Sequence, residues 1–172
     1  MPLVFQYGSN LSTARINAAT RLCGRARVIG PAFTAAPYEL AFTVWSESNG
    51  CAAADLLPGR GRAIWGVLYE IPEPAVFRSR CPPDRTCLDM VENEGRSYVR
   101  TRVQVCDGIG GDPLAEPVLT YLGNRRRRGI RTSTAYVRHI LAGLREHRVP
   151  EEYVAYVRGR IEENLGATVM EA

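Results

Sequence analysis

Strand patterns fill the first two thirds of the chain and helical patterns fill the last third, and this order constrains the fold more than any other feature. Short runs rich in β-branched and aromatic residues recur between turn residues, most clearly in "AIWGVLYEI" at 63–71. The segments "TSTAYVRHILAGLREH" and "PEEYVAYVRGRIEENLG" instead repeat apolar residues at helical spacing. Several short strands followed by two helices predict an α+β fold around a small mixed or antiparallel sheet that can close into a β-barrel with flanking helices.

The boundaries of these elements follow from turn residues and from periodicity. A short helix is expected after the first strand, where Asn10 or Ser12 can cap it. In the segment 97–106, alternation predicts a dry face that carries Val99 and a polar face that carries Tyr98. Residues 72–88, rich in Pro, Arg and Cys, are expected to form a long loop, part of which can be helical. Strands are predicted over residues 2–7, 25–34, 37–45, 51–57, 63–71, 97–106 and 117–123.

Length and composition favour a single globular domain over residues 1–172. Hydrophobic residues make up 45% of the chain and charged residues 23%, which are ordinary values for such a protein. No apolar stretch reaches the roughly 18 residues that span a bilayer, and the first ten residues lack the pattern of a secretory signal. We therefore expect a cytoplasmic protein without a membrane partner, as a monomer or a homodimer.

The cysteines and histidines do not form a recognisable metal-binding pattern. The five cysteines occur without a CxxC pair, and His139 and His147 lack the spacing of a metal-binding pair. We expect reduced thiols and no metal site. Cys81 and Cys87 lie close enough in sequence to approach each other, and whether they ever pair stays open.

The run "RRRR" at 125–128 resembles a nucleic-acid patch, but its context favours a solvated loop. Every basic residue of this chain is Arg, so an arginine run carries little information about a partner. No aromatic residues alternate with the run to stack on bases, as they do in proteins that bind single strands. We therefore expect no nucleic-acid partner. The GxSxG, GxGxxG and GxxxxGK[ST] motifs are also absent from the sequence.

Two short stretches carry candidate chemistry. The turn "YGSN" at 7–10 joins a strand to a helix and can direct several backbone N–H groups toward an oxyanion. The stretch "VENEGRSYVR" at 91–100 places Glu92 and Glu94 just before a strand. Taken separately, each stretch is also consistent with an ordinary capped or solvated turn.

Four segments in order, "YGSNL", "IWGVLYEI", "ENEGRSYVR" and "AYVRHILAGLREHRVPEEYVAYV", resemble the gamma-glutamylcyclotransferase-like family across nearly the whole chain. The resemblance implies a cofactor-independent enzyme of the lyase or acyltransferase type that acts on a small γ-glutamyl substrate. In its reaction the substrate's α-amine attacks the γ-glutamyl carbonyl, so that 5-oxoproline forms and the other amine leaves.

The resemblance also implies roles for particular residues. It assigns the catalytic carboxylate, as general base and then acid, to Glu94, which directly precedes the Gly of the "EG" pair, and it leaves Glu92 as a neighbour. The residues expected to bind the glutamyl group are Tyr7, Gly8, Ser9, Asn10, Leu11, Tyr98 and Tyr136.

Two other readings of the sequence remain open. The same site could catalyse hydrolysis of a γ-glutamyl amide, or transfer of its acyl group to another amine. Alternatively, the chain could be a non-catalytic binding module, including an RNA binder that uses the arginine run. The identity of the leaving amine is open in every case.

Overall fold

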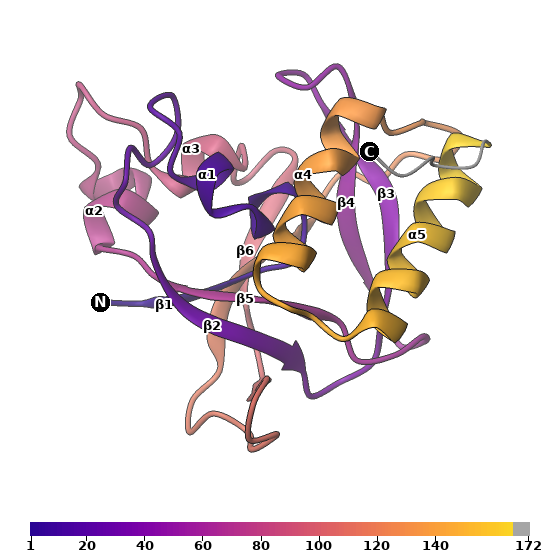
Figure 1. Cartoon of the computed structure of the whole chain (residues 1–172). Helices are drawn as coiled ribbons and strands as arrows, with labels where there is room; N and C mark the ends of the chain where they lie inside the picture. Colours follow the sequence, from indigo (N-terminus) through magenta and orange to yellow (C-terminus); the bar gives the residue numbers. More distant parts are fainter. Residues whose placement is uncertain (167–172) are drawn as a thin grey trace.

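The computed structural model describes residues 1–166, which form a curled six-stranded sheet, a separate two-stranded hairpin and flanking helices (Figure 1). The sheet has the order β6-β8-β1-β5-β2-β7, and the hairpin consists of β3 and β4. Within the sheet β1 pairs in parallel with β8, and the other pairs are antiparallel. The strands are β1 (Leu3–Gln6), β2 (Arg27–Thr34), β3 (Tyr38–Ser46), β4 (Cys51–Pro58), β5 (Trp65–Glu70), β6 (Tyr98–Val103), β7 (Val105–Asp107) and β8 (Val118–Gly123).

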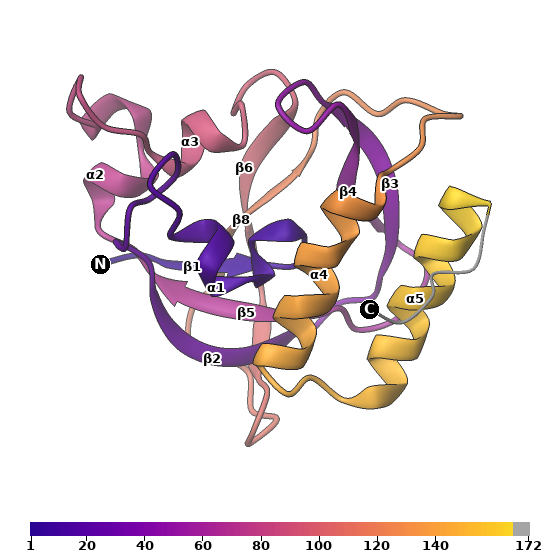
Figure 2. The same cartoon turned by 45° about the horizontal axis from the view of Figure 1, so that its top comes forward.

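The predicted α+β class with a mixed sheet and flanking helices is confirmed, and the curled sheet forms a half-barrel. Two long helices lie beside one another against the sheet and the hairpin (Figures 1 and 2). No helix within residues 1–166 is both long and apolar enough to cross a membrane. The helical segments are η1 (Ser9–Leu11), α1 (Thr13–Ile16), α2 (Glu73–Val76), η2 (Arg78–Arg80), α3 (Leu88–Val91), α4 (Thr134–Glu146) and α5 (Glu151–Leu165).

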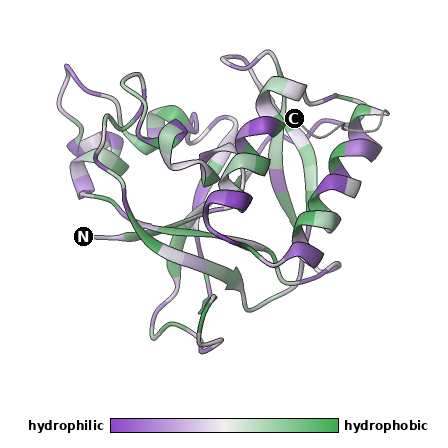
Figure 3. Cartoon of the chain, in the orientation of Figure 1, coloured by the Kyte–Doolittle hydropathy of each residue, from purple (hydrophilic) through white to green (hydrophobic). Residues whose placement is uncertain are grey.

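The two long helices are amphipathic, as the sequence predicts, and hydrophobic and hydrophilic residues alternate along both (Figure 3). In α4 the stripe Tyr136, Ile140 and Leu144 is buried, and the Ser133 hydroxyl accepts a hydrogen bond from the backbone N–H of Tyr136 at the first turn. Helix α5 packs on β3, where the Tyr156 hydroxyl accepts from a backbone N–H of the strand. Each helix thus buries one face, and α4 packs against η1.

The predicted strand 97–106 is divided into β6 and β7 at Gln104, and its first half faces the other way from our expectation. Val99 is 43% exposed, whereas Tyr98 is only 7% exposed. The Tyr98 hydroxyl donates to the backbone oxygen of Ala54 at 2.7 Å, so this ring points into the molecule toward the hairpin. The hydrogen bond of the Tyr98 hydroxyl allows this ring to be buried, although the alternation of apolar residues predicts the opposite face.

The segment 72–88 contains α2 and η2, so the expectation that part of this loop is helical is confirmed. Ala75 and Val76 of α2 are fully buried, as is Cys87 just before α3. All five cysteines are free thiols in the structure.

The arginine run 125–128 is exposed as expected, and Arg126 also forms an ion pair. The Arg126 Nε atom donates to Asp55 at 2.6 Å, and the Asp55 side chain is fully buried. That carboxylate also accepts from the Gly123 backbone N–H at 2.7 Å and from the Thr43 hydroxyl at 2.9 Å. The ion pair therefore ties the loop to the hairpin, although the Arg126 side chain remains 42% exposed.

Helix α4 approaches η1 so closely that Gly143 has no room for a side chain. A Cβ atom at this position would lie 2.4 Å from the backbone carbon of Leu11. We expect Gly143→Ala to destabilise the protein by about 1–3 kcal/mol, because overpacking against backbone outweighs the better helix propensity of Ala. Urea unfolding would measure the change.

Gly159 of α5 is the matched control, because a Cβ there meets no atom within 4 Å. Gly159→Ala should stabilise the protein by up to about 1 kcal/mol. Equal effects of the two substitutions would contradict a specific contact between α4 and η1.

Candidate active site

The first strand ends in a tight turn that brings polar residues into the interior. β1 ends at Gln6, and the turn continues through Gly8 into η1, where the Leu11 N–H donates to the Gly8 oxygen at 3.0 Å. A Cβ at Gly8 would lie 3.3 Å from the Cβ of Ala54 and 3.4 Å from the Tyr136 hydroxyl, so glycine allows the close approach. Ser9 and Asn10 are buried here.

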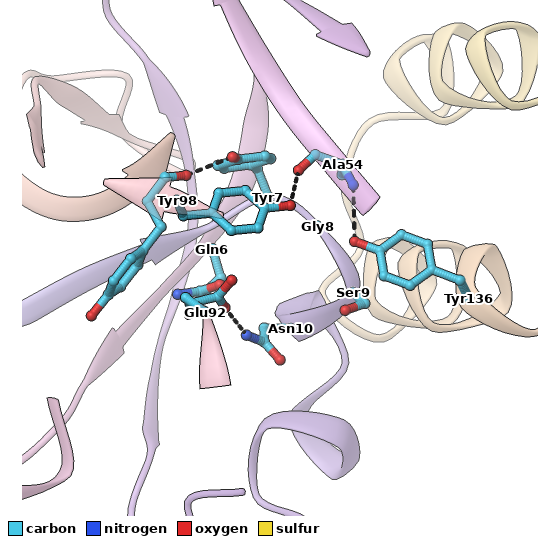
Figure 4. A pocket seen from close by; sticks show the side chains of 10 residues that line it. Gln6, Tyr7, Gly8, Ser9, Asn10, Ala54, Glu92, Tyr98 and Tyr136 are labelled. Carbon is cyan, nitrogen blue, oxygen red and sulfur yellow. Dashed lines mark hydrogen bonds between the residues drawn. The ribbon is translucent and has the colours of Figure 1, made fainter. Parts of the chain in front are cut away.

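Glu92 reaches this turn from the end of α3. Its backbone N–H donates to the Leu88 oxygen at 2.8 Å, which makes it the residue that terminates the helix. Its carboxylate oxygen Oε1 accepts from the side-chain amide of Asn10 at 2.7 Å (Figure 4). The structure therefore joins the two stretches singled out in the sequence, through Glu92.

Two neighbouring hollows border this contact. The inner hollow, of about 30 Å³, is lined by the turn, and the outer hollow, of about 240 Å³, lies beside it. Ser9, Glu92, Tyr98 and Tyr136 line both hollows. The outer hollow is also lined by Arg21, Trp45, Ser46, Glu47, Ser48, Asn49, Ala53, Met90, Val91, Asn93 and Ser97.

Three tyrosines hold the walls of the cavity in place. The Tyr98 hydroxyl donates to the Ala54 oxygen, and the Ala54 N–H donates to the Tyr136 hydroxyl at 3.0 Å (Figure 4). The Tyr7 hydroxyl donates to the backbone oxygen of Tyr121 at 2.6 Å. Burial raises the pKa of Tyr7, Tyr98 and Tyr136, so all three phenols stay neutral. Because Tyr136 uses its oxygen as an acceptor toward Ala54, its own proton can be directed elsewhere.

Burial raises the pKa of Glu92 from its usual 4.5 to about 7, while Arg21, Arg15 and the Asn10 hydrogen bond act in the opposite direction. Part of the residue reaches the surface, but protein encloses its carboxyl. A carboxyl that titrates near neutral pH can both accept and return a proton under physiological conditions.

Asp89, one turn earlier on the same helix, is buried in a different environment. It accepts from Arg100 at 2.6 Å, from the Tyr121 hydroxyl at 2.7 Å and from the Arg78 backbone N–H at 2.9 Å. Burial acts to raise the pKa of Asp89, but these donors, Arg100 foremost, bring the pKa below its usual value. Asp89 therefore stays ionised and anchors α3, which carries Glu92.

Glu94, the acid selected from the sequence, lies outside the residues that line either hollow. The chain reverses between the two acids: Asn93 has φ 50° and Gly95 has φ 85°, and the Glu94 N–H donates back to the Asp89 oxygen at 2.8 Å. This reversal separates Glu94 from Glu92. The structure thus brings Glu92, rather than Glu94, to the turn.

The predicted binding residues lie together with one exception. Tyr7, Gly8, Ser9, Asn10, Tyr98 and Tyr136 all line the inner hollow. Leu11 is buried outside it, where its backbone oxygen accepts from the Tyr69 hydroxyl at 3.1 Å and lies 3.0 Å from His147 Nε2. Leu11 therefore anchors the turn and does not face the hollow.

Gln6 and Arg21 line the hollows without having been predicted from the sequence, and Glu92 was not the acid selected from it. A signal for Glu92 exists: it follows the fully buried Leu88 by four residues, so one helical turn places both on the same side. No comparable sequence signal marks Arg21, which reaches the cavity through a loop. No group of three or more His, Cys, Asp or Glu in residues 1–166 could hold a metal ion.

Comparison with known proteins gives one family and several similar folds. Residues 4–138 match the family described as gamma-glutamyl cyclotransferase, AIG2-like. A solved structure named gamma-glutamyl cyclotransferase is 23% identical with a TM-score of 0.73, over 99% of this chain and 89% of its own. No curated protein sequence matches the chain significantly.

Two further solved structures share the fold. The human uncharacterized protein loc79017 is 24% identical with a TM-score of 0.72, over 98% of this chain and 88% of its own. YkqA from Bacillus subtilis is 23% identical with a TM-score of 0.73, and the match covers 98% of this chain and 56% of YkqA.

The pKa of Glu92 predicts a characteristic pH dependence of stability. Since the folded pKa of about 7 exceeds the usual 4.5, the contribution of Glu92 to stability is fully present below pH 4.5 and is lost as the pH rises through 7. Relative to Glu92→Gln, the wild-type protein should lose up to about 3 kcal/mol between pH 4 and pH 8. Urea unfolding of both proteins across this range would show it, and a difference that does not vary with pH would contradict an enclosed carboxyl.

Proposed function

Because the chain belongs to the gamma-glutamyl cyclotransferase, AIG2-like family, we propose that it converts a γ-glutamyl amide into 5-oxoproline and a free amine. The match to this family confirms the resemblance that was predicted from the sequence. The observation that supports the reaction is the enclosed Glu92 carboxyl, which is hydrogen-bonded to Asn10 of the turn after β1.

Glu92 serves as the proton carrier in this proposal, in place of Glu94. The substrate's α-amine attacks the γ-carbonyl carbon, a new N–C bond closes the five-membered ring, and the original amide C–N bond breaks. Glu92 accepts the proton from the attacking amine and returns it to the leaving nitrogen. A carboxyl with a pKa of about 7 is matched to both steps near neutral pH. Ring closure is intramolecular, so no second reactant has to be positioned.

The turn supplies donors for the carbonyl oxygen. Ser9 and Asn10 begin η1, and the first N–H groups of a helical segment have no acceptor within it. Donors that are already oriented stabilise negative charge as it develops on a carbonyl oxygen. The neutral Tyr136 hydroxyl borders the same hollow and adds a polar group beside the substrate.

Arg21 provides positive charge for the glutamyl α-carboxylate. Its guanidinium donates to Asn10 Oδ1 at 2.8 Å, and Asn10 donates in turn to Glu92. Within residues 1–166 Arg21 forms no ion pair with an acidic side chain. Asn10 thus separates a cation from the proton carrier by one amide group. The α-carbon of the glutamyl group bears an amine and a carboxylate. The amine can therefore lie at Glu92 while the carboxylate lies at Arg21.

Glu92→Gln should abolish turnover of a γ-glutamyl amide, with a loss of at least about 10²- to 10⁴-fold, because the amide side chain cannot carry the proton. The matched control is Glu94→Gln, which should retain near-normal activity because Glu94 lies outside the cavity lining. Release of 5-oxoproline, measured by mass spectrometry, would follow the reaction, and circular dichroism would confirm folding of both variants.

The same assay separates the proposed reaction from its alternatives. Free glutamate as the product would indicate hydrolysis, and a new γ-glutamyl amide would indicate acyl transfer. Loss of activity in Glu94→Gln together with retention in Glu92→Gln would reverse the assignment of the two acids.

Arg21→Met should lower kcat/KM by about 10- to 100-fold, because a charge-assisted hydrogen bond to the substrate is lost. If Arg21 binds the glutamyl α-carboxylate, γ-glutamyl-alanine and γ-glutamyl-ethylamide should be affected equally. Loss with γ-glutamyl-alanine alone would instead show that Arg21 binds a carboxylate on the leaving group.

A further inference from the structure

Gln6, the last residue of β1, places a buried amide in the wall of the inner hollow. The residue is 6% exposed, and it lines the hollow together with Glu92 (Figure 4). In the part of the chain that the structure describes, no group accepts a hydrogen bond from its Nε2 atom. The inner hollow thus contains a hydrogen-bond donor without a protein partner.

A buried donor without a partner destabilises a fold, because the donor has lost its water and gained nothing in return. The other glutamine of the chain, Gln104, shows the usual arrangement: its Nε2 atom donates to the Leu114 oxygen at 2.6 Å. Gln6 ends a strand whose preceding residues, Val4 and Phe5, are fully buried and apolar. An apolar side chain at position 6 would make the fold more stable than this glutamine does. The Gln6 amide therefore lacks an acceptor that a bound molecule could provide.

We infer that Gln6 is a catalytic residue whose Nε2–H donates a hydrogen bond to the γ-carbonyl oxygen of the substrate. This inference rests on the proposed cyclotransferase reaction and adds a side-chain donor to the backbone donors of the turn. The inner hollow, of about 30 Å³, has room for a group the size of a carbonyl and little more.

Charge favours the carbonyl over the α-carboxylate as the partner of Gln6. An ionised α-carboxylate in the inner hollow would lie beside the ionised form of Glu92, and two like charges in an enclosed site repel each other. The carbonyl oxygen is neutral while Glu92 is ionised. It becomes negative as the amine attacks, and in that step Glu92 takes up the amine's proton and becomes neutral. The hollow therefore holds one negative charge at a time, and Gln6 stabilises it on the oxygen.

Gln6→Met tests the inference, because methionine has a similar length and offers no donor. We expect kcat for γ-glutamyl-alanine to fall by about 10²- to 10³-fold, as is typical when one donor to an oxyanion is removed, with KM changed less than about threefold. Tm should rise by about 2–4 °C, because an unpartnered buried amide has been removed. Gln6→Ala, which is smaller, gives a second reading of kcat in case methionine does not fit.

Gln104→Met is the matched control, since it removes a glutamine whose donor already has a partner. It should lower Tm and leave kcat unchanged. A kcat of Gln6→Met or Gln6→Ala close to the wild-type value would overturn the role of Gln6, and so would a fall in kcat accompanied by an equal rise in KM. Failure of the wild-type protein itself to release 5-oxoproline would refute the proposed reaction instead, so the two failures are distinguishable.

Discussion

One hydrogen bond, from the Asn10 amide to the Glu92 carboxylate, joins the two segments on which the site depends. These residues are 82 positions apart in sequence, and the fold brings them to 2.7 Å. The contact requires α4 to pack closely on the turn after β1, which Gly143 allows because it has no side chain. It also requires α3 to be fixed in position on the opposite side of the contact. Each half of the contact is therefore positioned by packing and hydrogen bonds that involve neither Asn10 nor Glu92.

The anchoring of α3 shows how one helix can carry two acids whose pKa values shift in opposite directions. Asp89 accepts from an arginine, a tyrosine and a backbone N–H, and this set of donors keeps it ionised despite burial. Glu92 has one hydrogen bond from a neutral amide, with arginines only at longer range, and burial dominates. The number and charge of hydrogen-bond partners, rather than burial itself, separates a structural acid from one that can exchange a proton.

The sequence predicts the architecture better than it predicts the site. Turn residues and periodicity locate the strands and both long helices, and the "YGSN" turn lines the cavity as expected. The choice between Glu92 and Glu94 could not be made from the pattern alone, because it depends on backbone geometry. A left-handed conformation at Asn93 reverses the chain between the two acids. Arg21 and Gln6 belong to the site only because residues distant in sequence surround them, so local sequence patterns could not identify them.

Two groups that reduce stability lie together where catalysis is proposed. A carboxyl enclosed by protein and an amide without an acceptor both reduce stability, and Glu92 and Gln6 line the same small hollow. Within residues 1–166, three other buried side-chain atoms also lack a hydrogen-bond partner, in Arg15, Thr132 and Tyr153, but none of these residues lines the hollow. A protein selected for stability alone would satisfy or remove both groups. Their persistence in one place is explained if a substrate supplies the missing partners: an ammonium proton for the carboxylate and a carbonyl oxygen for the amide.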